Sequence, residues 1–296
     1  MCRECGIEYF EMSHLFTQWG AKHAPKIVAS DSKGREKKIF GWFTRTSSKK
    51  YDRFLRLFAA KLVEVIESEG LRENCYFHVS DEPSERHLKI YRKRAKLISE
   101  VFPGFKVIDA LSEYEFYEKG AVKHPIPCED KVEDFYGKVP ELWTYYCCGQ
   151  GDKYLPNRFL SMPSVRNRVL GFLLYKYDVK GFLHWGYNFY NSQYSIKAID
   201  PYKITDAGGG FPSGDSFIVY PAKDGTALES LRLKVFYDGF QDMRALKLLE
   251  SKIGREKTLE ILEEGLEKPL SFTEYPRCEE WLLSTRERIN QKIKEN

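Results

Sequence analysis

The chain has 296 residues, which is enough to bury a full hydrophobic core without disulfides or a structural metal. Its net charge of +4 is the balance of 47 basic and 43 acidic side chains that are mixed along the sequence, which predicts neither a nucleic-acid nor a membrane partner. Hydrophobic residues make up 42% of the chain, the mean hydropathy is −0.50, and no apolar run reaches the length of a signal-peptide core or a membrane span. The composition therefore predicts a soluble globular protein.

The seven cysteines are an odd number and show no repeating spacing. This pattern argues against a disulfide framework and predicts reduced thiols, as in a cytoplasmic protein. Cys2 and Cys5 form a lone CxxC pair with no second pair at zinc spacing, so we expect no metal site and no cofactor.

Segments with strand and helix periodicity alternate along the chain, which predicts βα units and a parallel sheet flanked by helices. The predicted strands are residues 7–12, 75–80, 105–110, 125–130, 142–148 and 181–187. The predicted helices are residues 51–69, 84–101, 163–177 and 228–250, together with a charged helical tail over 256–294.

A TIM-type (β/α)₈ barrel has eight strands, and the sequence offers six. We therefore expect an α/β fold in which residues 1–250 form a partial barrel that lacks its first two βα units. Residues 251–296 are expected to be a C-terminal helical extension packed on the barrel.

Two adjacent carboxylates, Asp81 and Glu82, follow the apolar strand 75–77 and precede a helix. The carboxyl ends of barrel strands are where α/β barrels hold their catalytic residues. Pro83 is expected to end the strand and to hold Glu82 in an extended conformation, so that both acids reach one pocket. The alternative is a simple helix start, in which these acids only favour the positive end of the helix dipole.

Several segments resemble the catalytic domain of glycoside hydrolase family 123, in the order in which that family has them. They are GIEYFEMSHLF at residues 6–16, LWTYYCC at 142–148, RVLG through GFLHWG at 168–186, and GDSFIVYP, SLRL and DGFQD within 214–242. The resemblance runs from about residue 6 to residue 250.

The resemblance implies a β-N-acetylgalactosaminidase with a TIM-barrel catalytic domain, which in this family usually follows an N-terminal β-sandwich. It implies substrate-assisted retention, in which the 2-acetamido group of the sugar is the nucleophile. The family's adjacent acid pair corresponds to Asp81 and Glu82, with Glu82 as general acid and base and Asp81 orienting the acetamido group. The implied partner is a glycan or glycolipid with terminal β-linked N-acetylgalactosamine, and the missing front of the barrel implies a separate or absent N-terminal half.

Six further residues are candidates for binding the sugar. By similarity to the family, Tyr145 supplies a hydroxyl to the acetamido oxygen, and Trp185 at a strand end stacks on the sugar face. His14, Trp42, Tyr187 and Asn188 lie near strand ends or in loops and could contact sugar hydroxyls.

Two other classes of protein stay open. A metal-dependent barrel hydrolase could use His14, His78, Asp81 and His184, which fall on or near strand ends. A truncated barrel could instead be inactive, or could bind sugar without turnover, because an open barrel exposes strand edges.

Overall fold

The structure is a computed structural model that describes residues 2–150 and 154–296. Its contacts divide the chain into two compact units. The first consists of Met1–Pro127 with Gly137–Glu141, and the second of Cys128–Tyr136 with Leu142–Asn296. Both units combine parallel strands with helices, and the C-terminal part is helical, so the predicted α/β class is confirmed.

The first unit holds six strands and three α-helices among its described residues. They are β1 (Phe10–Glu11), β2 (Ile27–Ser30), β3 (Glu36–Phe40), α1 (Lys49–Ser68), β4 (Cys75–Phe77), α2 (Leu88–Val101), β5 (Lys106–Ala110), α3 (Glu115–Glu118) and β6 (His124–Ile126). Four of the strands form one parallel sheet in the order β1-β4-β5-β6. Their carboxyl ends therefore meet at one edge of the sheet.

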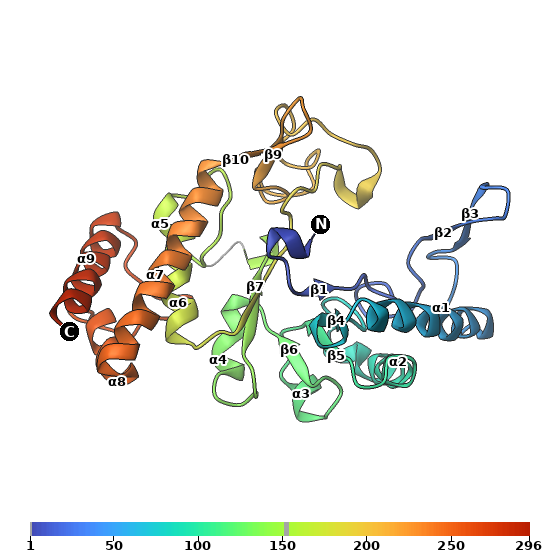
Figure 1. Cartoon of the computed structure of the whole chain (residues 1–296), viewed down its shortest axis with the longest axis horizontal. Helices are drawn as coiled ribbons and strands as arrows, with labels where there is room; N and C mark the ends of the chain where they lie inside the picture. Colours follow the sequence, from blue (N-terminus) through green and yellow to red (C-terminus); the bar gives the residue numbers. More distant parts are fainter. Residues whose placement is uncertain (1, 151–153) are drawn as a thin grey trace. The chain divides into compact units, whose positions relative to one another are not determined.

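The helices α1 and α2 lie side by side next to this sheet (Figure 1). On α1 the buried residues recur at helical spacing, which is why the helix presents one apolar face: Tyr51, Leu55, Ala59 and Ile66. The Tyr51 hydroxyl also donates a hydrogen bond to the carbonyl oxygen of Leu15, so this face holds the segment that follows β1.

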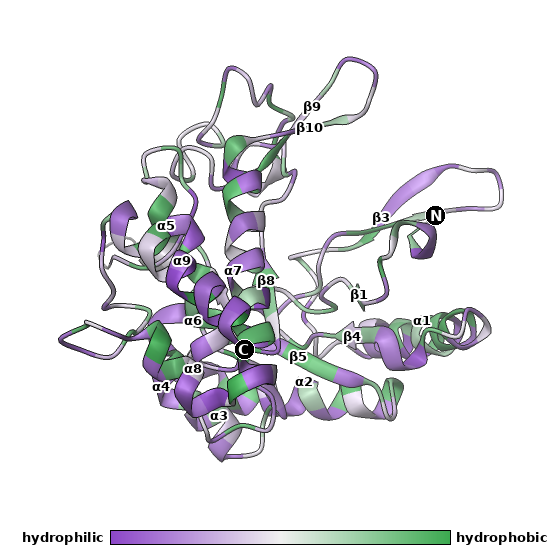
Figure 2. Ribbon diagram, turned by 60° about the vertical axis from the view of Figure 1, so that its left-hand side comes forward, coloured by the Kyte–Doolittle hydropathy of each residue, from purple (hydrophilic) through white to green (hydrophobic). Residues whose placement is uncertain are grey.

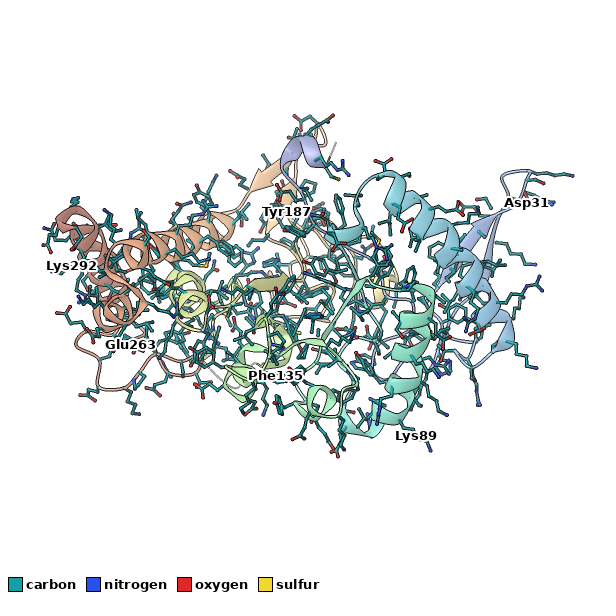
Figure 3. All side chains as sticks on the ribbon, turned by 60° about the horizontal axis from the view of Figure 1, so that its bottom comes forward. Asp31, Lys89, Phe135, Tyr187, Glu263 and Lys292 are labelled. Atoms are coloured by element: carbon teal, nitrogen blue, oxygen red, sulfur yellow. The ribbon has the colours of Figure 1, made fainter. Side chains whose placement is uncertain are left out.

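An antiparallel hairpin, β2–β3, projects from the first unit and was not predicted. Its strand β3 carries mostly hydrophilic residues (Figure 2), so it lacks the apolar alternation by which a strand is recognised in sequence. The label of Asp31 in Figure 3 marks its turn, where the Asp31 carboxylate accepts hydrogen bonds from the backbone N–H groups of Lys33 (2.8 Å) and Arg35 (3.0 Å). Such an Asx turn stabilises the reversal locally.

The described residues of the second unit hold four strands and six α-helices. They are α4 (Val132–Phe135), β7 (Trp143–Tyr146), α5 (Ser164–Arg168), α6 (Leu170–Lys176), β8 (Gly181–His184), β9 (Val219–Pro221), β10 (Ala227–Glu229), α7 (Leu231–Ile253), α8 (Arg255–Leu262) and α9 (Glu279–Glu295). Strands β7 and β8 pair in parallel, with Tyr145 opposite Leu183 and Tyr146 opposite His184.

Helix α7 organises the second unit, since it packs against α5, α6, α8 and α9. It begins at Ser230, whose hydroxyl accepts a hydrogen bond from the backbone N–H of Leu233 (3.2 Å). Two glycines let α6 and α7 touch through their backbones: a Cβ on Gly171 would lie 1.8 Å from the carbonyl oxygen of Gly239. The sequence predicted this helix from residue 228, but residues 227–229 pair with β9 as β10.

The six predicted parallel strands all exist, as β1, β4, β5, β6, β7 and β8. The predicted tail is wrong in part, because residues 263–278 separate α8 from α9 without α-helix. None of the seven cysteines forms a disulfide bond. Within the described ranges, no helix is both long and apolar enough to cross a membrane.

Candidate active site

The backbone that follows β4 is held in place by an acid on the neighbouring strand. Asp109 of β5 is fully buried, and its carboxylate accepts hydrogen bonds from the N–H groups of Val79 (3.0 Å) and Ser80 (3.2 Å) and from the Tyr91 hydroxyl. The Ser80 hydroxyl donates to the carbonyl oxygen of Thr17 (3.1 Å). The segment that presents Asp81 is therefore fixed from two sides.

Glu82 has a left-handed backbone, with φ at +42°, which corrects the extended conformation expected before Pro83. The Glu82 N–H donates to the carbonyl oxygen of Ala110 (2.9 Å), and the Asp81 carbonyl accepts from the N–H of Trp19 (2.9 Å). These two bonds impose a conformation that a non-glycine residue rarely adopts. Strain of this kind costs about 1–3 kcal/mol and is concentrated at functional sites.

The helix start lies beyond the acid pair. Ser84 and His87 form the capping box, in which the N–H of Ser84 donates to Nδ1 of His87 (3.1 Å). The short 3₁₀ helix Glu85–His87 then leads into α2. Capping is thus carried out by Ser84, and Asp81 and Glu82 lie in the loop between β4 and this helix.

Asp81 lines a cavity together with two other candidate residues, His14 and Trp42. The cavity has a volume of about 230 Å³ and is smaller than typical ligand pockets of about 300–1,000 Å³, so it has room for only a small ligand or part of a larger one. Trp42 is 58% exposed and stacks near the ring of His23. The structure therefore places an acid, an imidazole and an exposed indole around one small hollow.

A buried histidine lies between two carboxylates next to this cavity. Nε2 of His78 is 2.8 Å from Oε1 of Glu11, and its Nδ1 is 3.5 Å from Oδ1 of Asp109. Burial by itself lowers the pKa of His78, but the two carboxylates outweigh burial and raise this pKa to about 9. His78 is therefore a cation at neutral pH, and His14 stacks on it at a ring distance of 4.3 Å.

The pKa of Asp81 is raised to about 7. Burial is the largest cause, and the neighbouring carboxylates Glu82 and Asp109 add to it, whereas the charge of His78 acts in the opposite direction. A carboxyl group with this pKa exists in both protonation states near neutral pH, so the charge of Asp81 changes with pH in this range.

Among the described residues, His14, His78 and Asp109 form one group that could hold a metal ion, with ligand atoms within 4.8 Å of one another. Their present contacts are to protein groups. The Asp109 oxygens accept hydrogen bonds from Val79, Ser80 and Tyr91, and the two ring nitrogens of His78 face the carboxylates of Glu11 and Asp109.

His184, the fourth member of the predicted metal set, belongs to the second unit and is engaged elsewhere. Its Nε2 accepts a hydrogen bond from Nε of Arg158 (2.8 Å). Burial, with the adjacent guanidinium, lowers the pKa of His184 to about 3, so the ring is neutral. The predicted metal set of His14, His78, Asp81 and His184 is therefore not supported by these contacts.

The other four candidates lie in the second unit, on β7 and after β8. Tyr145 is buried, with 8% of its surface exposed, and its backbone pairs with Leu183 on one side and Cys128 on the other. Trp185 follows β8 directly, and its indole N–H donates to Asp215 (3.2 Å). Tyr187, labelled in Figure 3, is half exposed, and Asn188 is exposed and forms an antiparallel bridge with Phe217.

Sequence reasoning missed Glu11, Asp109, Arg158 and Asp215. An acid inside an apolar strand was the available signal for Asp109, since isolated carboxylates are rarely buried without a specific partner. Arg158 gave no such signal, because it lies outside any regular element and its partners come from residues 184–215.

Comparison with known proteins places the chain in a family. No curated protein sequence matches it. Among solved structures it is similar to a family 123 glycoside hydrolase from Clostridium perfringens, whose structural analysis concerned glycolipid glycan hydrolysis, with a TM-score of 0.61 and 19% identity. That match covers 91% of this chain and 49% of the other, so the chain spans about half the length of this relative, and the likeness shows the fold alone. The family model described as the glycoside hydrolase 123 catalytic domain matches residues 1–249, and the chain therefore belongs to glycoside hydrolase family 123.

Proposed function

We propose that this chain is a glycosidase that removes β-linked N-acetylgalactosamine by a substrate-assisted, retaining mechanism. The observation that carries the proposal is the adjacent pair Asp81 and Glu82 at the carboxyl end of β4, with Asp81 in a cavity and its pKa raised to about 7. Membership of glycoside hydrolase family 123 supports hydrolysis of a glycosidic bond. A glycan or a glycolipid is the substrate class, in keeping with the subject of the Clostridium perfringens structure.

In this mechanism the acetamido oxygen of the sugar attacks the anomeric carbon as the bond to the leaving oxygen breaks. Glu82 gives its proton to that oxygen, and a bicyclic oxazolinium ion forms. Asp81 accepts a hydrogen bond from the acetamido N–H and offsets the positive charge. Glu82 then takes a proton from water, which attacks the anomeric carbon and restores the acetamido group. Because the substrate supplies the nucleophile, the protein needs no second carboxylate across the sugar ring.

The remaining candidates bind the sugar in this proposal. Trp185 supplies an aromatic surface for the apolar face of the ring, and Tyr145 directs its hydroxyl to the acetamido oxygen. His14 and Trp42 share a cavity with Asp81, which supports contacts near the acetamido group. Tyr187 and Asn188 are exposed enough to meet sugar hydroxyls or the aglycone.

We propose that the parallel strands of the two units belong to a partial (β/α)₈ barrel of about six βα units. Residues 1–250 form its catalytic part in this proposal, and residues 251–296 form a helical extension. The packing of α8 and α9 on α7 supports the second point.

The proposal is tested with Glu82→Gln and two substrates, an aryl β-N-acetylgalactosaminide with a good leaving group and an alkyl glycoside with a poor one. General acid help contributes about 10²–10⁴-fold, so we expect the alkyl substrate to lose nearly all turnover and the aryl substrate much less. Glu85→Gln, an exposed acid three residues further on, is the matched control and should behave as the wild type. Full activity of Glu82→Gln on the alkyl substrate would overturn the assignment.

The metal-dependent alternative rests on the group His14, His78 and Asp109. It is distinguished by metal analysis of the purified protein and by the effect of a chelator on hydrolysis. Activity that a chelator abolishes and zinc restores would favour that class over the substrate-assisted one.

A further inference from the structure

The Trp185 indole is tied to a buried ion pair. Its Nε1–H donates to Oδ2 of Asp215 at 3.2 Å, and the other carboxylate oxygen, Oδ1, lies 3.4 Å from Nη1 of Arg158. The side chains of Asp215 and Arg158 are both fully buried. The carboxylate therefore connects the indole to a guanidinium away from solvent, where such hydrogen bonds are strong.

Arg158 is itself fixed by several acceptors. Its Nη2 donates to the carbonyl oxygens of Trp185 (2.7 Å) and Asp215 (2.7 Å), and its Nε donates to His184 (2.8 Å). One guanidinium thus holds the end of β8, the loop that carries Asp215, and the carboxylate between them. A planar, permanently charged group is suited to such a multidentate role.

The backbone around Trp185 is equally constrained. Gly186 has φ at +71°, and a Cβ at this position would lie 2.4 Å from the carbonyl oxygen of Asp215. The indole ring also packs against the rings of Phe189 and Phe211, with distances between ring centroids of 5.6 Å and 5.1 Å. The side chain is therefore held at its polar edge by a carboxylate and at its ring by two aromatic neighbours.

We propose that Asp215, fixed by Arg158, is a positioning residue that holds the Trp185 indole in one orientation as the surface on which the sugar stacks. The inference rests on the proposed function, in which Trp185 contacts substrate. Holding a side chain in its bound orientation before the ligand arrives strengthens binding, because the ordering is not required at the binding step. Asp215 acts through Trp185 and does not need to touch the sugar.

The hydrogen bond between the Trp185 indole and Asp215 is first tested without ligand. The measurement is the NMR spectrum of the indole N–H resonances of ¹⁵N-labelled protein. The Trp185 resonance is identified by its loss in Trp185→Phe. We expect it to be shifted downfield and protected from solvent exchange in the wild type, to lose both properties in Asp215→Leu, and to regain them in part in Asp215→Asn, whose amide oxygen still accepts. A Trp185 resonance unaffected by Asp215→Leu would show that Asp215 does not hold the indole, and would overturn the proposal.

The consequence for binding is tested with the thiazoline analogue of N-acetylgalactosamine, which mimics the oxazolinium ion, in a double-mutant cycle. Asp215→Leu and Trp185→Phe should each weaken binding of the thiazoline by about tenfold. The double variant should bind little more weakly than either single variant, because both substitutions remove the same hydrogen bond between Trp185 and Asp215. KM for the aryl substrate should rise more than kcat falls. Trp281→Phe is the matched control, since the buried Nε1 of Trp281 has no hydrogen-bond partner among the described residues, and it should bind as the wild type.

The outcomes separate the two proposals. A wild type that neither binds the thiazoline nor cleaves the aryl substrate overturns the proposed function and this inference with it. If the wild type binds the thiazoline and cleaves the aryl substrate, the variants decide the role of Asp215. That role is overturned, and the proposed function is kept, if Asp215→Leu binds the thiazoline normally or if the losses of affinity of the two single variants multiply in the double variant. If Asp215→Leu does not fold, Asp215→Asn, which keeps the size of the side chain, replaces it in the cycle. Weaker thiazoline binding together with a shifted Trp185 resonance supports the role of Asp215, and wild-type binding with an unchanged resonance overturns it.

Discussion

At the residue scale, burial first and the surrounding charges second set the acidity of Asp81. Burial and the carboxylates Glu82 and Asp109 raise its pKa, and the buried His78 cation lowers it. His78 keeps that charge because Glu11 and Asp109 lie on either side of its ring. The four acids and one cation thus form a coupled group at the carboxyl ends of β1, β4 and β5.

The first prediction concerns the pH dependence of hydrolysis. In the proposed mechanism Asp81 must be ionised to accept the acetamido N–H, so kcat/KM should rise with pH through about 7, the raised pKa of Asp81. His78→Asn removes the charge that lowers this pKa, and the rise should move to higher pH. Rate profiles of the two proteins check this, with His124→Asn on β6 as the control, and an unmoved profile in His78→Asn would contradict it.

The second prediction concerns stability. The folded pKa of His78, about 9, exceeds its unfolded value of about 6.5, so the folded state binds more protons in this window. The stabilisation is fully present below pH 6.5, and up to about 3 kcal/mol is lost as pH rises to 9. Asp81 acts in the same direction between about pH 4 and 7, because its folded pKa is also raised.

Denaturant unfolding at pH 6.5 and pH 9 measures the first of these effects. The wild type should be less stable at pH 9, and His78→Asn should show a flatter dependence in the same window. His124→Asn should keep the wild-type slope, because burial lowers the pKa of His124 and its titration falls below this range. A His78→Asn protein with an unchanged slope would show that His78 is not the group responsible.

At the element scale, close contact between α6 and α7 depends on glycine. A Cβ on Gly171 would overlap the backbone of Gly239, and a Cβ on Gly239 would lie 2.8 Å from the carbonyl oxygen of Arg168. These contacts bring the helices together next to Asp242 of α7. The buried Asp242 carboxylate accepts from Arg168 (2.7 Å) and from Arg286 of α9 (2.7 Å), so one acid joins three helices.

The third prediction is that Gly171→Ala destabilises the protein by about 1–3 kcal/mol, because the helices must separate to admit the methyl group. The midpoint of thermal unfolding should fall by several degrees. Lys247→Ala, at an exposed position of α7, is the matched control and should change stability by less than about 0.5 kcal/mol. Equal midpoints for the two variants would mean that the glycine contact does not set the spacing of the helices.

At the scale of the whole molecule, the question is whether this chain folds and binds as one protein. Each unit has its own hydrophobic core, with large buried aromatic side chains such as Phe77 and Phe116 in the first and Tyr146 and Phe172 in the second. Cores of this kind favour a cooperative transition, which an inactive open fragment would lack.

The fourth prediction follows from mass action. The thiazoline at about 100 times its Kd should stabilise the folded chain by about 2.7 kcal/mol and raise the midpoint of thermal unfolding by about 5–10 °C. Asp81→Asn should reduce this shift, and a methyl β-galactoside without the acetamido group should give none. A cooperative transition with no shift would leave a folded protein without this site, and no cooperative transition would favour the truncated-fragment alternative.

The regular elements were largely predictable from the sequence. Apolar runs such as residues 75–77 and 105–110 identify buried parallel strands, and apolar spacing over 51–69 identifies α1, because both patterns arise from local geometry. The β2–β3 hairpin was missed because β2 is only four residues long and β3 carries mostly hydrophilic residues, and β10 was missed because it runs directly into the cap of α7.

The sequence by itself determined the α/β class, the family and the presence of two adjacent acids after a strand, since each of these follows from the pattern of residues that are close together in the chain. Only the tertiary structure decided the protonation and orientation of the site. Glu11 and Asp109 lie on β1 and β5 and His78 directly follows β4, and Arg158, Trp185 and Asp215 come together across 57 residues of chain. The left-handed backbone of Glu82 likewise depends on hydrogen bonds to Ala110 and on the fixed segment before it. Such effects depend on burial and on distances between groups, which sequence spacing does not specify.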